Sequence, residues 1–204
     1  MEANKHKGKF IVLEGLDGSG QSTQVGLLRE FLIAKGHKVL TTKEPTIDSK
    51  PGRKIKEALG KKIEIDPAEL QKLFAQDRKE HLEKTIIPAL KRGEFVVSDR
   101  YFFSTFAYGV SDGLDLDWLI KINNDFLLPD IIFILKVRPE VCISRIEKRG
   151  TEKTLFEREQ KLAKVWETYA VMPSRFKNSI IVDGEKSIPE VFEDIKKIII
   201  EKII

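Results

Sequence analysis

The chain has 204 residues, of which 41% are hydrophobic, enough for a substantial core in one domain over residues 1–204. Its formal net charge of +4 is a mild excess on a mixed-sign surface, so charge alone does not indicate a nucleic-acid partner. One cysteine excludes an intramolecular disulfide, and no apolar run approaches the roughly 20 residues that span a bilayer. We therefore expect a soluble cytoplasmic protein that binds neither nucleic acid nor membrane.

Strand-like and helix-like segments alternate along the chain. Residues 10–13 form a short apolar run that leads into glycines, which is typical of a buried parallel strand. A helix is predicted over 22–34, with Gly36 after it, and a second strand over 38–42. The later predicted elements are a helix, or two helices meeting near Pro88, over 67–91; strands at 95–98, 131–135 and 180–182; helices over 139–149 and 155–176; and a C-terminal helix after Ser187.

Five short apolar strands separated by helices predict one fold class. Parallel strands need helical crossovers, which cover both faces of the sheet. We therefore predict an α/β fold of three layers, with a five-stranded parallel sheet between helices and a short lid. Ligands of such sheets bind beyond the carboxyl ends of the strands, so the residues at those ends are the candidates for a functional site.

The first predicted strand ends in a glycine-rich segment. Residues 15–22 read G-L-D-G-S-G-Q-S, which follows the phosphate-loop pattern G-x-x-x-x-G-K-[ST] at Gly15, Gly20 and Ser22. Such a loop points backbone N–H groups at phosphate oxygens, and the helix dipole adds to the attraction. A plain strand-to-helix turn is the competing interpretation, and the flanking strand and helix favour the phosphate loop. The residues assigned to the ATP phosphates are Gly15, Asp17, Gly18, Ser19, Gly20, Gln21, Ser22 and Thr23.

Gln21 departs from the pattern, which has lysine at this position. Glutamine donates neutral hydrogen bonds, and bonds that involve a charged partner are about twice as strong. Because phosphoryl transfer depends mainly on positioning and charge stabilisation, turnover should fall unless another cation compensates. Three alternatives stay open: an arginine elsewhere substitutes, the chain is a weak or inactive homologue, or the glutamine was introduced to trap a complex.

The predicted strand at 95–98 is followed by an acidic and a basic residue, Asp99 and Arg100. A carboxylate next to a phosphate loop can hold Mg²⁺ together with the hydroxyl of Ser22. The planar fork of an arginine can hold a phosphate through two bonds. Taken alone, a surface ion pair at the end of a strand explains the two residues equally well.

Longer segments make the pattern specific. Residues 99–108 read D-R-Y-F-F-S-T-F-A-Y, and residues 74–78 read F-A-Q-D-R. These segments resemble the D-R-Y-x-x-S-x-x-A-Y and F-A-x-D-R signatures of the thymidylate kinase family. Glu44 and Pro45 resemble the start of its E-P-G-G-T loop, although 46–49 read T-I-D-S and the glycines are absent. Matches in the family's order extend over about 9–193, and the resemblance implies a P-loop kinase fold.

The resemblance implies a role in dTMP binding for several residues. Phe74 would stack on the thymine ring, Arg78 would bond the base edge, and Ser104 would lie near the base. Tyr108 would occupy the place of a ribose 2′-hydroxyl, and Asp17 would reach the 3′-hydroxyl. Without the family pattern, Phe74 is as readily a core residue, Arg78 a solvated residue and Tyr108 an ordinary aromatic on a helix face.

The remaining implied roles concern the phosphates and the metal. Glu44 would belong to the acceptor site, Arg100 would hold the acceptor monophosphate, and Asp99 would organise Mg²⁺ and its water. The basic segment 145–158 would be a lid that closes over the triphosphate and supplies an internal arginine finger. Arg149 is the first candidate for this finger. The second candidates are Arg145 and Arg158, although a charged exposed helix explains any one of these arginines equally well.

The resemblance implies a homodimeric enzyme that transfers the γ-phosphoryl group of ATP to dTMP with Mg²⁺, giving dTDP and ADP, with Asp99, Arg100, Arg149 and Gln21 at the reacting groups. The nearest alternative is a kinase of dUMP or of another nucleoside monophosphate. A non-catalytic nucleotide-binding protein is a second alternative because of Gln21. A P-loop GTPase or ATPase switch is a third, weaker one, because the chain lacks an N-K-x-D pattern.

Overall fold

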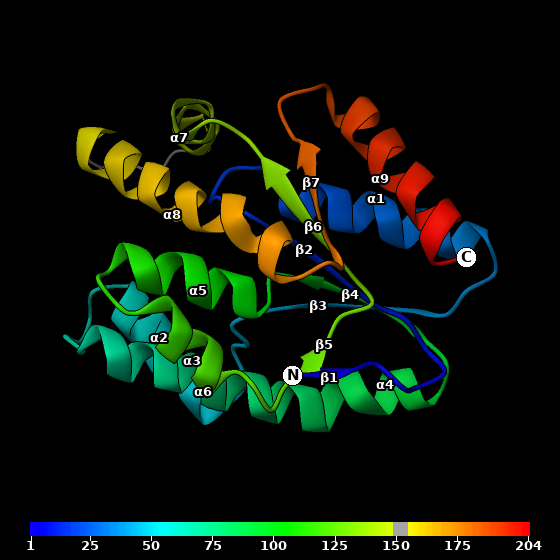
Figure 1. Cartoon of the computed structure of the whole chain (residues 1–204), viewed down its shortest axis with the longest axis horizontal. Helices are drawn as coiled ribbons and strands as arrows, with labels where there is room; N and C mark the ends of the chain where they lie inside the picture. The colour runs from blue at the N-terminus through cyan, green and yellow to red at the C-terminus, as the bar shows by residue number, and fades with distance from the viewer. Residues whose placement is uncertain (149–154) are drawn as a thin grey trace.

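The computed structural model describes residues 1–148 and 155–204, except for the side chains of 155–158. Its main sheet has five parallel strands in the spatial order β3-β4-β2-β6-β7 (Figure 1). These strands are β2 (Phe10–Gly15), β3 (Val39–Lys43), β4 (Phe95–Asp99), β6 (Ile131–Lys136) and β7 (Ser179–Asp183). All five coincide with the apolar runs of the sequence, so the predicted α/β fold with a parallel sheet is confirmed.

Helices cover both faces of this sheet. On one face lie α1 (Gln21–Ala34) and α9 (Ile188–Lys202), whereas α5 (Phe102–Ser111) and α8 (Leu155–Arg175) lie on the other (Figure 1). Successive strand residues alternate between the two cores, as the period of two in a strand requires. Ile11 and Leu13 pack with the α1 and α9 side, whereas Phe10 and Val12 pack with the α5 and α8 side. The sheet is therefore apolar on both faces, and its strand ends are left for polar ligands.

The long helical segment predicted over 67–91 is continuous but not uniform. It runs as α3 (Pro67–His81), a π-helical turn η1 (Leu82–Ile86) and α4 (Ile87–Lys91). The side chain of Asp66 accepts hydrogen bonds from the N–H groups of Ala68 and Glu69, so Asp66 is the N-cap of α3. The widened turn ends two residues before Pro88, which has no N–H to donate to a regular helical bond.

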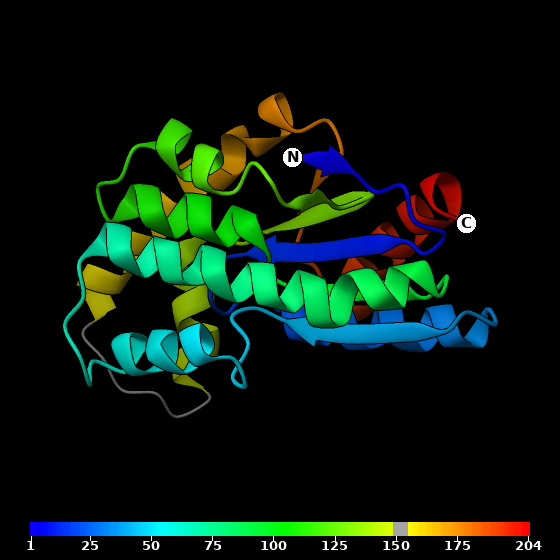
Figure 2. The ribbon, with the colours of Figure 1, turned by 90° about the horizontal axis from the view of Figure 1, so that it is seen from below.

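The structure contains elements that the sequence patterns did not indicate. They are α2 (Lys50–Leu59), α6 (Leu116–Ile122) and a two-stranded parallel pair, β1 (Glu2–Ala3) with β5 (Leu127–Leu128). Strands of two residues are too short for a periodic signal, and this pair joins segments far apart in the chain. In Figure 2 the strands of the main sheet point toward the end of the molecule at which α2 lies. The carboxyl ends of the strands, the phosphate loop and α2 are therefore on one side.

The remaining helix α7 (Pro139–Glu147) follows β6, and α9 begins with a capping box formed by Ser187 and Glu190. Within the described residues, no helix is both long and apolar enough to cross a membrane.

Candidate active site

The glycine-rich segment forms a tight loop between β2 and α1. Gly18 and Gly20 have φ angles of 88° and 99°, which side chains other than glycine rarely tolerate. At Gly18 a Cβ atom would also lie 2.5 Å from the carbonyl oxygen of Cys142. Gly20 is the N-cap of α1 and has no side chain to cap it, so the first N–H groups of the helix remain available to an anion. The hydroxyl oxygen of Ser19 is buried and has no hydrogen-bond partner in the described part of the chain.

The side chain of Gln21 is buried against this loop and uses both ends of its amide. Its Nε2 donates to the carbonyl oxygen of Gly15 at 3.3 Å. Its Oε1 accepts from Nη2 of Arg100 at 3.2 Å. An ammonium group can make the first contact but not the second, because it has no acceptor atom. Gln21 therefore couples the loop to Arg100, which a lysine at this position does not do.

Ser22 and Asp99, the predicted metal ligands, lie together. Asp99 ends β4, whose neighbours in the sheet are β2 and β3. The Ser22 hydroxyl donates to Oδ2 of Asp99 at 2.5 Å, and Nζ of Lys43 lies 3.0 Å from the same oxygen. The second oxygen, Oδ1, is buried and has no hydrogen-bond partner among the described residues. A hydroxyl beside a carboxylate with an unused oxygen suits a hard divalent cation.

The metal site is incomplete as a set of protein ligands. In residues 1–148 and 155–204 there is no cluster of three or more His, Cys, Asp or Glu side chains that could hold a metal ion. Mg²⁺ commonly keeps several waters and is bound through one or two protein oxygens plus substrate phosphates. Ser22 and Asp99 therefore fit a cation that arrives with the nucleotide better than one held by the protein alone.

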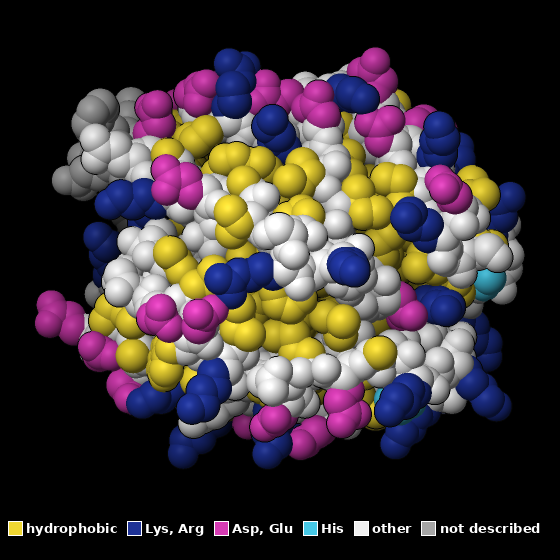
Figure 3. Space-filling view, in the orientation of Figure 1, with side chains coloured by type: hydrophobic (Ala, Val, Ile, Leu, Met, Phe, Trp, Pro, Cys, Tyr) yellow, Lys and Arg dark blue, Asp and Glu magenta, His cyan; other side chains and the backbone are white. Residues whose placement is uncertain are grey.

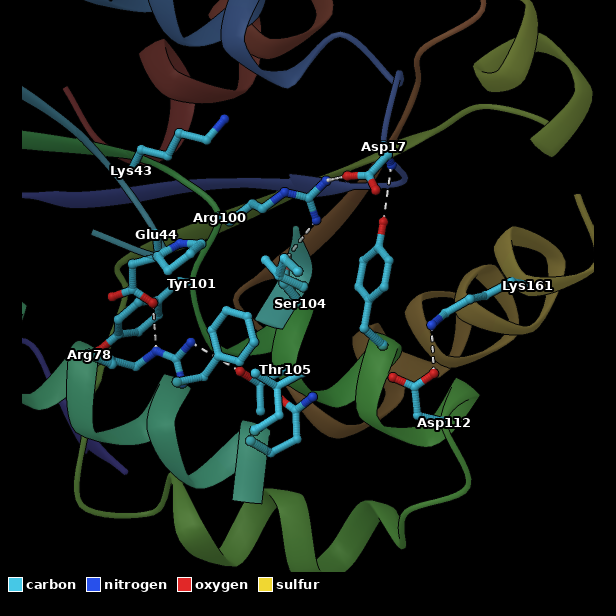
Figure 4. Close-up of a pocket in the computed structure, with 16 residues that line it drawn as sticks. Asp17, Lys43, Glu44, Arg78, Arg100, Tyr101, Ser104, Thr105, Asp112 and Lys161 are labelled. Carbon is cyan, nitrogen blue, oxygen red and sulfur yellow. Dashed lines mark hydrogen bonds and ion pairs between the residues drawn. The ribbon is translucent and has the colours of Figure 1, made fainter. Parts of the chain in front are cut away.

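Arg100 lies where the loop, β4 and α5 meet. Its φ of 76° is unusual for a residue with a side chain, and its backbone is held by hydrogen bonds to Leu13 and from the Ser98 hydroxyl. Its guanidinium donates to Asp17 at 2.6 Å and to Ser104 at 3.0 Å. The group is thus fixed on several sides at the mouth of the loop, as a phosphate clamp requires (Figure 4).

A pocket of about 290 Å³ opens next to Arg100, between the loop, α3 and α5 (Figure 4). Its size approaches that of typical small-molecule sites. All the residues predicted to bind the acceptor line it: Asp17, Glu44, Phe74, Arg78, Arg100, Ser104 and Tyr108. The fold therefore brings together residues that were predicted from four separate segments of the sequence.

Arg78 is almost fully buried, which the sequence did not indicate, since a solvated residue was the competing interpretation. Its Nε donates to Oε2 of Glu44 at 2.8 Å, and Nη2 donates to the Thr105 hydroxyl at 3.1 Å. A further bond from Nη1 reaches Asn123. The other oxygen of Glu44 lies 3.1 Å from Nδ1 of His81. Arg78 thus faces the pocket with a guanidinium whose orientation is set by a buried carboxylate.

Glu14 is a site residue that the sequence analysis missed. It is fully buried and accepts hydrogen bonds from the Tyr101 N–H at 2.8 Å, the Ser104 hydroxyl at 2.6 Å and the Tyr169 hydroxyl at 3.0 Å. Burial raises its pKa to about 7, and the nearby charge of Arg100 opposes that shift. It ties β2 to α5 and α8 and so positions Ser104 beside Arg100. A lone Glu within an apolar strand segment was the only available signal.

Gln71 and Lys43 also line the pocket and were not selected from the sequence. The Oε1 of Gln71 is buried without a hydrogen-bond partner in the described residues. Gln71, Phe74 and Arg78 are spaced at i, i+3 and i+7, which places them on one face of α3. That spacing was readable in the sequence, but it does not separate a ligand-binding face from a core face.

One of the three candidate lid arginines is described, and it contacts the loop. Arg145 on α7 donates to the carbonyl oxygens of Ser19 at 3.3 Å and Gly184 at 3.2 Å. Arg149 and the side chain of Arg158 lie outside the described part of the structure.

The parallel sheet, the glycine loop at the start of α1 and the Ser22–Asp99 pair define a P-loop nucleotide-binding protein. The sequence model described as thymidylate kinase matches residues 13–195. A "Probable thymidylate kinase" of Pyrococcus horikoshii is 42% identical over 195 residues, covering 93% of this chain and 94% of that protein. A "Thymidylate kinase" of Caldicellulosiruptor saccharolyticus is 36% identical, with coverage of 95% and 96%. The chain belongs to the thymidylate kinase family, which confirms the resemblance seen in the sequence.

Proposed function

We propose that the chain transfers the γ-phosphoryl group of ATP to dTMP, giving dTDP and ADP. An oxygen of the dTMP phosphate attacks the γ-phosphorus, and the bond from that phosphorus to the β,γ-bridging oxygen breaks as ADP leaves. The observation that carries the proposal is the placement of Arg100. Its guanidinium bonds both to Asp17 and Gln21 of the phosphate loop and to Ser104, which lines the acceptor pocket.

The donor nucleotide binds through the loop. Backbone N–H groups of 15–23 surround its phosphates, and Ser22 with Asp99 holds Mg²⁺ beside them. When bound, the cation neutralises charge on the β- and γ-phosphate oxygens. The unpartnered oxygens of Ser19 and Asp99 support this role, because buried polar atoms without partners are costly unless a ligand satisfies them.

The acceptor nucleotide occupies the pocket. Phe74 stacks on the base, and Arg78, held by Glu44, donates to the base edge. The Tyr108 hydroxyl, which accepts from the Asp17 N–H at 3.2 Å, stands where a 2′-hydroxyl would project. The Asp17 side chain is 60% exposed, so it is free to turn from Arg100 to the 3′-hydroxyl as the phosphate arrives. Arg100 then holds the acceptor phosphate.

Segment 145–158 acts as the lid. Its closure excludes water, which otherwise competes as the acceptor of the phosphoryl group. Arg149 supplies the arginine finger. Arg145, at the start of the lid segment, contacts the phosphate loop through the carbonyl oxygen of Ser19.

We propose a homodimer as the assembled form. Figure 3 shows hydrophobic side chains gathered in the middle of the face that it displays, with a few Lys and Arg side chains among them. A second copy of this chain on that face would remove the apolar surface from water. Sedimentation equilibrium at micromolar concentration tests this, and a monomer mass at all concentrations contradicts it.

An acceptor panel tests the proposed reaction. ADP release is measured with ATP and each of dTMP, dUMP, CMP and AMP in turn. We expect the largest kcat/KM with dTMP. The guanidinium of Arg78 can only donate hydrogen bonds, whereas cytosine and adenine present an amino group, which is also a donor, at the matching edge. Preference for dUMP, CMP or AMP assigns another monophosphate kinase. ATP binding without ADP release on any acceptor assigns a non-catalytic protein.

A further inference from the structure

The phosphate loop lacks the ammonium group of its usual lysine. Gln21 reproduces one contact of such a group, the bond to the Gly15 carbonyl, but it carries no charge. The triphosphate is a polyanion, and a charged donor contributes more to its binding than a neutral amide. We propose that Lys43 supplies the positive charge that position 21 lacks, an inference that rests on the proposed kinase function.

The sheet brings Lys43 to the site although it is far from the loop in sequence. Lys43 is the last residue of β3, and its Cα pairs in register with that of Asp99 on β4. Its Nζ lies 3.0 Å from Oδ2 of Asp99, the same oxygen that accepts from Ser22. The ammonium of Lys43 therefore lies beside the carboxylate that accepts from Ser22, the loop residue that directly follows Gln21.

The ammonium is free to change partner. The Lys43 side chain is 60% exposed, and a flexible chain of four carbons carries its charge. The Asp99 side chain is only 6% exposed, so the pair opens when another cation takes the place of the ammonium on that carboxylate. A cation bound to Asp99 competes for the same carboxylate. Lys43 then turns from Asp99 to the phosphate oxygens that accompany the cation.

Two arginine side chains near the loop already use their guanidinium groups in hydrogen bonds to the protein. The guanidinium of Arg100 is 13% exposed and bonds to Asp17, Ser104 and Gln21. That of Arg145 donates to two backbone carbonyl oxygens. Within the part of the chain that the structure describes, Lys43 is thus the mobile cation at the metal-binding end of the loop.

Equilibrium binding tests the proposal without turnover. Calorimetry with Mg²⁺ compares ATP, ADP and AMP on the native chain, Lys43→Met, Gln21→Lys and the double variant. We expect Lys43→Met to weaken ATP and ADP binding roughly tenfold, the loss of one charged hydrogen bond, and to leave AMP within about twofold. In the Gln21→Lys background the same change should weaken ATP less than about threefold, because lysine at position 21 restores the charge.

Matched controls separate this role from others. Lys38→Met removes the lysine that directly precedes the other end of β3 and should leave all affinities unchanged, whereas Lys43→Arg should keep most of the ATP affinity. Thermal melting confirms that each variant is folded. The proposal is overturned if Lys43→Met does not weaken ATP binding. It is also overturned if Lys43→Met weakens ATP binding equally in the native chain and in the Gln21→Lys variant. A native chain that binds ATP but forms no ADP with dTMP contradicts the proposed function instead.

Discussion

The two ends of the active site differ in how complete they are without ligand. In the acceptor pocket the buried charges are matched: Arg78 bonds to Glu44, and Glu44 also contacts His81. At the phosphate loop, the buried oxygens Ser19 Oγ and Asp99 Oδ1 have no partner among the described residues. Since unpaired buried polar atoms cost free energy, the donor end is built for a ligand that satisfies them. At the base-binding end the charged groups are already paired within the protein, and the unpartnered atom described there is the neutral Oε1 of Gln71.

This contrast separates two kinds of mutational effect. Changes at the donor end should reduce turnover with little effect on the free energy of unfolding, because the groups there serve the ligand. Changes at the acceptor end should reduce stability as well as dTMP binding, because the same groups hold the fold together.

The largest effect is expected for Arg149→Ala in the lid. Removal of an arginine finger takes away charge stabilisation that is specific to the transition state, so kcat should fall about 1,000-fold. The KM for dTMP should change less than about threefold, because the acceptor groups are untouched. Steady-state kinetics with dTMP as the varied substrate measures both. Unchanged turnover would show that Arg149 is not the arginine finger, and substitutions of Arg145 and Arg158 would then be tested.

Asp99→Asn should lower kcat about 100-fold by weakening the hold on Mg²⁺. The Asn side chain keeps a carbonyl oxygen that can accept from Ser22. The substitution also removes a buried carboxylate oxygen that has no partner among the described residues. The free energy of unfolding should therefore change by less than about 1 kcal/mol. Activity as a function of Mg²⁺ concentration and urea unfolding give the two quantities. A loss of stability of several kcal/mol at this position contradicts the contrast between the two ends.

Glu44→Gln should have its main effect on stability. It leaves the Arg78 charge buried without a counter-charge, which costs about 3 kcal/mol in the free energy of unfolding. Glu80→Gln is the matched control, because Glu80 forms an exposed pair with Lys84 one helical turn away and should cost less than about 0.5 kcal/mol. Urea unfolding compares the two variants, and equal small losses show that the Arg78–Glu44 pair is not the support of the pocket.

A further prediction concerns pH and Glu14. Its folded pKa of about 7 exceeds the ordinary value of 4.5, so between these values the folded chain keeps a proton that the unfolded chain releases. Stability attributable to Glu14 therefore falls as pH rises through this window, by at most about 1.4 kcal/mol per pH unit, and levels off above it. The free energy of unfolding of the native chain minus that of Glu14→Gln should show this fall. A difference independent of pH contradicts it.

The sheet and the loop were predictable because their signals are local. Four of the five strands of the main sheet contain an apolar run of three or more residues, and the spacing of Gly15, Gly20 and Ser22 is contained within eight residues. The buried polar pairs were not predictable, since Arg78 meets Glu44 across 34 residues and Arg100 meets Gln21 across 79. A single sequence also gives no sign that an exposed lysine such as Lys43 lies beside Asp99. The pocket residues were found through the family signature, and periodicity alone would have assigned Phe74 to the core.

The most direct test of the account follows the label from [γ-³²P]ATP when the native chain is incubated with dTMP and Mg²⁺. The account predicts labelled dTDP that forms with enzyme-dependent, saturable kinetics, equal in amount to the ADP released, and that disappears when Mg²⁺ is chelated. Label that stays in ATP, or that appears only as inorganic phosphate, would contradict a kinase in which the loop and Arg100 join the two nucleotides.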